Sequence, residues 1–485
     1  MKRIIFITSV FIVLIKVNIF SQNYYDVYRI TETTPITTSR SAGVGNSFGA
    51  FGGDFSSIYT NPAGLGIYRK SEFAFTPSFS LFNFKSEYFG QKSEDYSTRF
   101  GINHLGFVIT SNSFDNNSMG ITFAFGYIKQ NLYNTNRIIS GKNNYTSLSD
   151  YFMTYAEGKT VDELDPFYEW VAYDAYIIDE YEPGKYETPV PVPIYQRKTF
   201  DVGGGLSEYS TALAFNFENN LYFGLSFSLF NYNYNETKKH YEEDIDNLSD
   251  FNHFTFTEDL QSKGTGLSAR LGVISRPVDF FRIGFSASLP IVLKVKDRFT
   301  TSMISYFDNG SKYEGYPQDY DGNKIDYNIS EYKMVSPLKL ALASGLQISN
   351  FALIGGEIEY IPYSMMRLRS IDPSIDFTFD NQSITDIFKN VFNFKLGGEI
   401  RFGNIQLRSG FNYYPSPYKE GELNENMYRI LVSGGIGIRT ENFFIDFAGI
   451  YNLKKEKYNL YDYENNISEL IDSKLYFNTT IGFRF

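Results

Sequence analysis

Strict alternation of apolar and polar residues, sustained over most of the chain, is the feature that most limits how this sequence can fold. In the last segment one face carries Leu475, Phe477, Thr479, Ile481, Phe483 and Phe485, and the other carries Tyr476, Asn478, Thr480, Gly482 and Arg484. A period of two residues predicts β-strands. Segments of this kind recur from residue 71 onward, and we predict an all-β fold of about fourteen antiparallel strands.

The connections between these segments are alternately short and long. Short ones include Asn219-Asn220, Gly403-Asn404 and Thr440-Glu441-Asn442. The long, polar ones cover residues 135–205, 236–262, 300–333, 370–390, 414–426 and 456–472. Short turns at one end and long loops at the other are typical of outer-membrane barrels, whose sheet closes because lipid offers no backbone hydrogen-bond partners. We therefore predict a transmembrane β-barrel over residues 71–485, with a large soluble β-sandwich or barrel as the alternative.

The face opposite the apolar stripe carries glycine, serine, asparagine and full charges. Its charged members include Arg270, Glu357, Glu359, Lys395, Glu399, Arg401, Arg408, Arg429 and Arg439. A membrane barrel turns its apolar stripe toward lipid and keeps polar groups in the lumen. We interpret the charged set as a lumen ladder of ion pairs that stiffens the wall, with a minority in contact with a ligand.

The N-terminus has the pattern of a secretory signal. A basic start, Met1-Lys2-Arg3, precedes an apolar run from Ile4 to Ile15 and a small residue, Ser21. The run is too short to span a bilayer comfortably. We predict a signal peptide over residues 1–21, with an uncleaved anchor as the alternative. The terminal aromatic Phe485 favours recognition by the barrel assembly machinery, so we expect a protein of the Gram-negative outer membrane in contact with its lipid.

Composition argues against several kinds of chemistry. The net charge of −11 argues against a nucleic-acid partner. The chain has no cysteine, which excludes thiol catalysis and thiolate metal sites, and His104, His240 and His253 lack the spacing of metal ligands. The sequence has no nucleophile elbow and no Walker loop. We expect no metal, no cofactor and no enzyme, with a Ser/His/Asp barrel enzyme as the alternative.

Residues 22–70 do not alternate, and the stretch 41–66 is dense in glycine, which lets backbone approach backbone. We predict that they form a hatch in the lumen, because a barrel this wide is not filled by its own side chains. The stretch contains Ser41, Gly43, Gly45, Asp54, Ser56, Asn61, Pro62 and Ala63. This pattern resembles the plug signature of FadL-type outer-membrane transporters of long-chain fatty acids and other hydrophobic compounds, in a Bacteroidetes-like form.

Other segments extend the resemblance, and one residue departs from it. Gly264–Pro290, Pro337–Arg367 and Lys395–Tyr413 are also similar to the family, whereas Ser47 stands where the family often has alanine. The resemblance implies a fourteen-strand barrel in which the hatch residues Gly43, Gly45, Asp54, Ser56, Asn61, Pro62 and Ala63 hold or move the plug. It also implies ligand capture near the external loops and sideways exit through a gap at the third strand.

The third strand is predicted at Met119–Tyr133, where Gly120 and Gly126 allow a kink. Ordinary strand glycines are the alternative.

The loop 135–205 is the longest, and it is acidic and aromatic. A solvated surface, a ligand lid and a partner-binding surface all fit it. Its size departs from the family, whose external groove uses the next two loops.

Two functional hypotheses follow. The first is uptake of a hydrophobic, fatty-acid-like small molecule across the outer membrane, with lateral exit from the barrel. The second is a FadL-like barrel that serves type IX protein secretion or surface assembly, with secretion-system proteins as partners.

Overall fold

The structure, a computed structural model, describes residues 24–32, 37–111, 119–373, 375–463 and 466–485. The predicted signal peptide and the predicted short turn at 113–117 lie outside the described residues.

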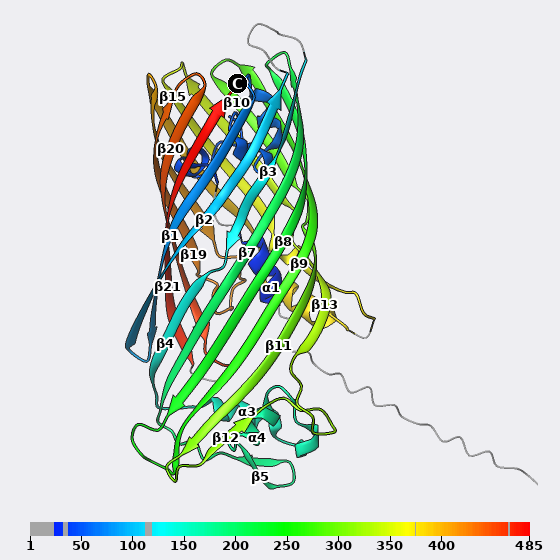
Figure 1. Cartoon of the computed structure of the whole chain (residues 1–485), viewed down its shortest axis with the longest axis vertical. Helices are drawn as coiled ribbons and strands as arrows, with labels where there is room; N and C mark the ends of the chain where they lie inside the picture. Colours follow the sequence, from blue (N-terminus) through cyan, green and yellow to red (C-terminus); the bar gives the residue numbers. More distant parts are fainter. Residues whose placement is uncertain (1–23, 33–36, 112–118, 374, 464–465) are drawn as a thin grey trace, which may run out of the picture.

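One antiparallel sheet closes into a barrel (Figure 1). Its strands are β1 Glu72–Tyr88, β2 Gln91–Thr110, β3 Gly120–Leu132, β4 Thr135–Asn143, β7 Ile194–Phe217, β8 Leu221–Glu243, β9 Phe251–Val278, β10 Phe281–Ser288, β11 Val292–Phe307, β12 Lys312–Gly315, β13 Asn328–Val335, β14 Lys339–Ile348, β15 Ala352–Pro362, β16 Arg367–Ser370, β17 Asn390–Phe402, β18 Ile405–Pro415, β19 Tyr428–Arg439, β20 Phe443–Asn459 and β21 Ile467–Arg484. β1 pairs with both β2 and β21, which closes the ring.

The wall has 14 strands. Four wall positions each hold two strand segments, namely β3 with β4, β10 with β11, β13 with β14, and β15 with β16. The short strand β12 pairs with the end of β11 within a loop. The predicted strand number and antiparallel closure are therefore confirmed.

The apolar stripe of the strands faces outward. On β18, Leu407 and Phe411 are exposed, whereas Arg408 and Asn412 point inward and are buried. The same alternation recurs along the other strands, so exposed leucine, isoleucine, valine and phenylalanine side chains form a belt around the barrel. An apolar exterior around charged inward positions is the arrangement of a membrane barrel. It contradicts the alternative of a soluble barrel with an apolar core and a wet exterior.

The helices are short and lie before the barrel or in its loops. They are α1 Tyr24–Thr31, α2 Ser39–Gly43, η1 Phe55–Ile58, η2 Pro62–Ile67, α3 Leu148–Ala156, η3 Val161–Glu163, α4 Glu169–Asp174, η4 Tyr363–Met365 and α5 Thr378–Ile387. Among the described residues, none of these helices is long and apolar enough to cross a bilayer.

The second loop is shorter and more ordered than predicted. β4 and the first part of β7 pair with each other and extend the wall into the predicted loop. Residues 144–193 remain, and they contain α3, η3, α4 and a hairpin of β5 Asp179–Glu182 and β6 Lys185–Glu187. This unit, called the cap below, lies at the loop end of the barrel (Figure 1).

The strands near the cap are far longer than a bilayer requires. A spanning strand needs about 9–11 residues, whereas β8 has 23 and β9 has 28. On β8 the outward residues from Leu221 to Leu229 are apolar, and Asn231, Asn233 and Asn235 continue the same face. The apolar belt therefore ends near Leu229, and the rest of the strand stands beyond it on the loop side. The loops predicted at 135–205 and 236–262 were too long, because polar outward residues hide the alternation in the strand ends that lie within them.

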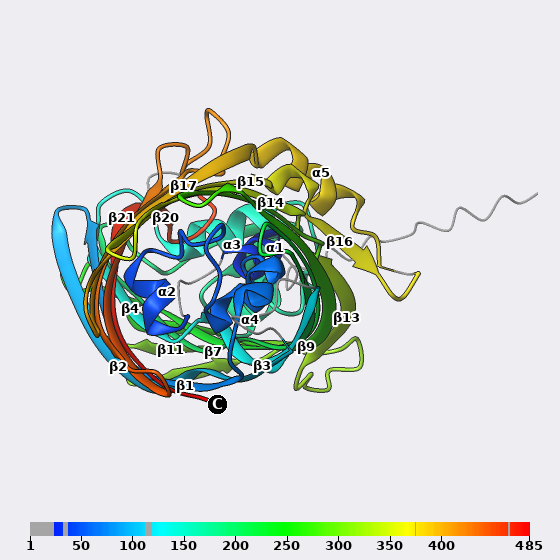
Figure 2. The same ribbon diagram turned by 90° about the horizontal axis from the view of Figure 1, so that it is seen from above.

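The N-terminal residues lie inside the ring of strands (Figure 2). α2 packs against β18 to β21, and η2 packs against β7, β8 and β9. α1 lies deeper in the lumen, toward the loop end (Figure 1). The described residues from 24 to 70 are called the hatch below.

Candidate functional site

Asp54 organises the first half of the hatch. Its carboxylate accepts hydrogen bonds from the Ser56 N–H at 3.0 Å and from the Thr38 hydroxyl at 2.6 Å, which caps η1. Burial alone would raise the pKa of the Asp54 carboxyl. The Arg40 guanidinium and the two hydrogen bonds lower this pKa by more than burial raises it, so it lies below the usual value. Asp54 is therefore an anion within the hatch.

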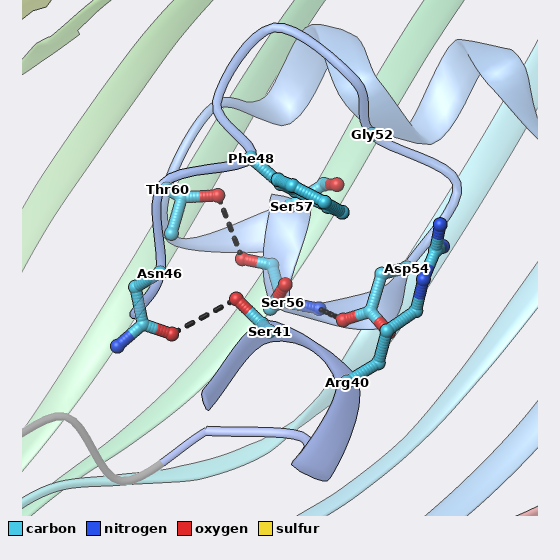
Figure 3. Close-up of a pocket in the computed structure, with 9 residues that line it drawn as sticks. All are labelled: Arg40, Ser41, Asn46, Phe48, Gly52, Asp54, Ser56, Ser57 and Thr60. Atoms are coloured by element: carbon cyan, nitrogen blue, oxygen red, sulfur yellow. Dashed lines mark hydrogen bonds between the residues drawn. The ribbon is translucent and has the colours of Figure 1, made fainter. Parts of the chain in front are cut away.

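A polar cavity of about 10 Å³ lies beside Asp54 (Figure 3). It is lined by Arg40, Ser41, Asn46, Phe48, Gly52, Asp54, Ser56, Ser57 and Thr60. The Ser41 hydroxyl donates to the Asn46 side-chain oxygen at 2.9 Å across it. Such a volume holds about one water molecule, so this cavity belongs to the internal packing of the hatch and does not fit a transported compound.

Asn61 connects the second half of the hatch to the wall. Its side-chain oxygen accepts from the Ala63 N–H at 3.2 Å and caps η2, where Pro62 occupies the first turn. Its amide nitrogen donates to the Gly49 carbonyl at 2.9 Å and to the Val273 carbonyl of β9 at 3.3 Å. The Asn-Pro-Ala part of the signature therefore turns the chain and ties it to the barrel.

Glycines on the inner face of the wall let the backbone and the phenylalanine rings of the hatch touch it. The set, called the glycine ring below, is Gly106, Gly126, Gly224, Gly272, Gly284, Gly345, Gly355, Gly397 and Gly410. A Cβ atom on Gly224 would lie 2.1 Å from the Pro62 carbonyl carbon, and one on Gly397 would lie 2.1 Å from the Val44 carbonyl oxygen. Contacts this short exclude any side chain. The hatch is therefore held by close contact with many strands at once.

The predicted hatch residues Gly43 and Gly45 lie in the same contact zone. The Gly43 carbonyl accepts a hydrogen bond from the Ser433 hydroxyl of β19 at 3.1 Å. Gly45 has a φ of +65°, and its nitrogen lies 2.3 Å from where Gly410 would carry a Cβ atom. The structure thus brings all seven predicted hatch residues into one packed unit. A role for them in gating stays a prediction.

The predicted lumen charges fall into separate groups. One of them consists of Arg40, Glu399, Arg401, Arg408, Arg439 and Asp446, joined by ion pairs. Arg40 of the hatch donates two hydrogen bonds to Glu399, at 3.0 and 3.3 Å, and Arg408 bridges Glu399 at 2.7 Å and Asp446 at 2.6 Å. Arg40 and Asp446 were not among the predicted site residues, although Asp446 lies on the inward side of its strand's alternation.

Two further groups are ion pairs among wall residues alone. Lys395 contacts Glu357 at 2.8 Å and Glu359 at 3.5 Å. Arg270 of β9 reaches across β8 to Glu208 of β7 at 2.9 Å. Sequence reasoning missed Glu208 because the two residues are separated by a strand, and a single sequence does not show which inward positions align across it.

Helix α1 presents a charged face to the wall. Arg29 lies 3.6 Å above the ring of Tyr234. Glu32, just after the helix, contacts Arg429 at 3.5 Å and Lys454 at 3.6 Å. The predicted lumen residue Arg429 therefore pairs with the hatch, and its guanidinium also lies 4.1 Å above the ring of Tyr414 on β18. No part of the sequence analysis predicted α1.

The other face of α1 joins a large apolar cluster in the loop half of the barrel. Val27, Tyr28 and Ile30 belong to it, and the Tyr28 and Phe388 rings stack with centroids 5.6 Å apart. Wall and loop residues of the cluster include Phe152, Tyr232, Phe254, Phe256, Tyr332, Met334, Tyr363, Met366 and Tyr418. Porin-type barrels have a polar, water-filled interior. The sequence analysis expected a polar lumen throughout, but the structure places a large aromatic cluster in the loop half, beside buried ion pairs such as that of Arg137 with Asp472.

The ladder between β2 and β3 is incomplete. Within the described residues it ends at His104 and Ile128, although β2 begins at Gln91. Phe100 and Ile102, on the part of β2 beyond this end, are 77% and 47% exposed. The wall therefore has a break beside its third strand, at the level where the outward residues are still apolar.

The predicted kink glycines lie away from this break. Gly120 pairs with Asn216, and Gly126 pairs with Gly106 and Ser210, all in regular register. A Cβ atom on Gly126 would lie 2.6 Å from the Phe55 ring of the hatch, so this glycine makes room for the hatch. The register of β3 shifts between Lys129 and Asn131 instead. A lateral opening at Gly120 and Gly126 stays a prediction.

The histidines do not assemble into a site. The His104 ring packs on Phe55 with centroids 4.3 Å apart, and its Nδ1 lies 3.2 Å from the Thr76 hydroxyl. His240 and His253 lie on other strands. In the part of the chain that the structure describes, no group of three His, Asp or Glu side chains is placed to hold a metal ion.

Comparison with known proteins places the fold. Neither a protein-family model nor a curated protein matches the chain significantly. A Pseudomonas aeruginosa FadL homologue aligns over 94% of this chain and 99% of its own, with 12% identity and a TM-score of 0.54. The Pseudomonas putida toluene transporter TodX aligns over 92% and 97%, with 11% identity and a TM-score of 0.54. The monoaromatic hydrocarbon channel CymD aligns over 93% and 97%, with 11% identity and a TM-score of 0.50. Likeness at this identity concerns the fold, and the predicted FadL-type barrel fold is confirmed.

Proposed function

We propose that this protein is a non-enzymatic channel of the Gram-negative outer membrane that takes up small hydrophobic compounds. The apolar belt, the long loops at one end and the short turns at the other support the location, because bacterial outer-membrane barrels share these features. The FadL homologue, TodX and CymD share the fold, and the last two are described as a toluene transporter and a monoaromatic hydrocarbon channel. Their substrates indicate the class of compound for this chain.

The observation that carries the proposal is the aromatic interior between hatch residues 37–70 and the cap, which includes part of α1. Tyr28, Tyr332, Met334 and Phe388 are fully or almost fully buried there, in a space that a hydrophilic pore would fill with polar groups. Aromatic and thioether side chains give an apolar solute favourable contacts, and they offer little to a sugar or an ion. A compound of low polarity is therefore the solute that this interior fits.

A lateral exit completes the proposed route. The hatch fills the far end of the lumen in close contact with the glycine ring, so a straight passage requires it to move as a whole. The break beside β3 offers a shorter way, because Phe100 and Ile102 on its edge belong to the apolar exterior. A hydrophobic compound leaving there passes into the bilayer without entering water.

A disulfide between β2 and β4, at the loop end of the break, tests whether these strands must separate for the lateral exit. The Ser93 hydroxyl of β2 and the Ser140 hydroxyl of β4 lie 2.8 Å apart, and the chain has no other cysteine to compete. We expect the oxidised S93C/S140C variant to take up radiolabelled oleate and toluene severalfold more slowly than the same variant after reduction. The assay uses cells that lack any other channel of this fold.

The control disulfide joins β2 to β3, the neighbouring strand, at a place where the two are already paired. Thr110 and Thr122 are direct ladder partners of β2 and β3, so oxidised T110C/T122C should transport like its reduced form. Equal uptake by oxidised and reduced S93C/S140C would contradict the lateral exit. Surface expression of the folded barrel is measured first, and only variants that reach the wild-type level are assayed for uptake.

A second candidate function rests on the folded state of the cap. Tyr145, Tyr176 and Tyr181 are 64%, 51% and 56% exposed. Exposed tyrosines on an ordered loop form a better binding surface for a protein partner than the same residues on a flexible loop. A role in type IX secretion or surface assembly therefore remains our alternative proposal. Deleting residues 148–190 should leave oleate uptake intact and abolish surface display of secreted proteins if this alternative holds.

A further inference from the structure

Positive side chains gather on the outer face of the wall directly beyond the apolar belt. On β11 the outward residues Lys294, Lys296 and Arg298 are exposed, whereas Leu293, Val295 and Asp297 between them are buried inside. Neighbouring outward positions on β9, β13 and β16 add three more exposed cations. The set, called the basic band below, is Lys263, Lys294, Lys296, Arg298, Lys333 and Arg369.

The register of the sheet puts these cations next to one another. Lys294 is the direct partner of Lys333, and Lys333 is the direct partner of Arg369. Lys296 is the direct partner of Lys263. Like charges that face each other across antiparallel strands destabilise a sheet. Three such pairs in adjacent rows are therefore a cost that the fold itself does not explain.

Internal ion pairs compensate the band only in part. Glu331 contacts Lys294 at 3.1 Å and Lys296 at 3.5 Å. The side chains of these two lysines remain 58% and 53% exposed. Arg298 lies 4.2 Å above the ring of Tyr327, which holds the guanidinium but supplies no countercharge. The band is a local excess of positive charge on a chain whose net charge is −11.

The height of the band on the wall identifies its counterpart. The outward residues on its membrane side are Val292, 42% exposed, and Leu267, 61% exposed, at the end of the apolar belt. Val292 and Leu267 are direct ladder partners, and Thr265 and Lys294 form the next pair of that kind. The cations therefore begin where hydrocarbon gives way to head groups, on the leaflet that faces the loops.

We propose that the basic band binds the phosphate groups of anionic glycolipids in the leaflet on the loop side. The proposal rests on the membrane placement proposed above and not on the identity of the transported compound. Each Lys or Arg near a membrane surface adds to the attraction for anionic lipid, and adjacent cations can bind one phosphate together. Bound phosphates also relieve the repulsion among Lys294, Lys333 and Arg369.

The test compares two sets of exposed lysines on opposite parts of the wall. The variant K294Q/K296Q/K333Q removes half of the band, and K455Q/K457Q removes the outward lysines of β20 as a control. Each full-length protein is reconstituted in phosphatidylcholine nanodiscs that contain lipid A, a diphosphorylated glycolipid. The lipid A that stays bound after extraction into detergent is counted by native mass spectrometry.

We expect the wild-type protein and K455Q/K457Q to retain lipid A. We expect K294Q/K296Q/K333Q to retain at most about one tenth of the wild-type amount. Dephosphorylated lipid A should be retained poorly by all three. Equal retention by the band variant, or equal retention of the dephosphorylated lipid, would overturn the proposal.

Two further measurements separate this proposal from the others. The thermal midpoint of K294Q/K296Q/K333Q in detergent without lipid A should equal or exceed that of the wild type, because the variant loses like-charge pairs; a lower midpoint would count against the band as an electrostatic cost. Oleate uptake should persist in the band variant. If uptake is absent from every protein while lipid A retention follows the pattern above, the transport proposal fails and the lipid site stands.

Discussion

Contact with the hatch explains why many glycines occur on the inner wall. Glycine weakens a strand, because it has no side chain to pack and loses more entropy on folding. Gly224 and Gly272 nevertheless lie on neighbouring strands, and each would push a Cβ atom into the Asn61-Pro62-Ala63 turn. These glycines weaken their strands, but they allow the hatch to pack directly against the wall.

A single methyl group at this contact should loosen the hatch. In Gly224→Ala the new Cβ atom meets backbone atoms of Pro62 at 2.1 Å, which have no rotamer to move away, and overpacking of this kind costs about 1–3 kcal/mol. We expect a lower thermal midpoint and faster proteolytic cleavage within residues 37–70. Gly356→Ala is the matched control, since its Cβ atom would find its nearest neighbour at 3.9 Å. Equal behaviour of the two variants would contradict a rigidly held hatch.

The sequence indicated half of this contact. The glycine-dense hatch and its signature pointed to backbone close to backbone, and the signature residues do form one unit. The wall glycines and Arg40 were not foreseen as partners of the hatch. Which strand position faces which hatch residue depends on how the closed barrel wraps the hatch, and alternation within one strand carries no information about that.

At the scale of elements, the cap is held by a buried carboxylate at its base. Glu242 of β8 accepts hydrogen bonds from the Ser147 hydroxyl at 2.5 Å and from the Leu148 N–H and the Gln196 side chain at 2.8 Å. These bonds fix the first turn of α3. The second loop was predicted to be the longest one, but its helices were not, because its acidic and aromatic composition resembles that of a solvated surface loop.

Neutralising this carboxylate should release the first turn of α3. In Glu242→Gln one oxygen becomes an amide nitrogen, which cannot accept, so a buried donor loses its partner at a cost of about 1–3 kcal/mol. We expect faster hydrogen exchange at the amides of Leu148–Ala156 and little change in the membrane-spanning strands. Glu243→Gln, one residue further and on the other face of β8, should leave the exchange rates unchanged. Faster exchange in both variants would refute a specific role for Glu242.

At the scale of the whole molecule, the two-residue period was enough to predict the barrel, its strand number and its inside-out polarity. Closure follows because backbone hydrogen bonds must be satisfied within lipid, the polarity follows from contact with lipid, and the strand number comes from counting the alternating segments. The period was not enough to predict the ends of the strands, since a wall that leaves the bilayer needs no apolar side chains and its outward face becomes Asn231, Asn233 and Asn235.

Two arginine substitutions on β8 should locate the edge of the bilayer. Phe227 and Asn235 both point outward, and Phe227 is 59% exposed. An arginine facing lipid near the midplane costs about 2–4 kcal/mol, and the cost falls toward zero outside the hydrocarbon. Phe227 lies one outward position inside Leu229, where the belt ends, so Phe227→Arg should lower the free energy of unfolding in liposomes by about 1–2 kcal/mol. Asn235→Arg should leave it nearly unchanged. An equal cost at both positions would show that the bilayer reaches further up the wall than the apolar belt.

The long wall also determines what a molecule arriving from solution meets first. From Leu267 to Phe251, β9 continues past the belt for roughly 40 Å, at about 3.3 Å per residue and a tilt of about 40°. The entrance under the cap is therefore held well above the apolar belt. A solute that approaches from the loop side meets the protein before it reaches the bilayer.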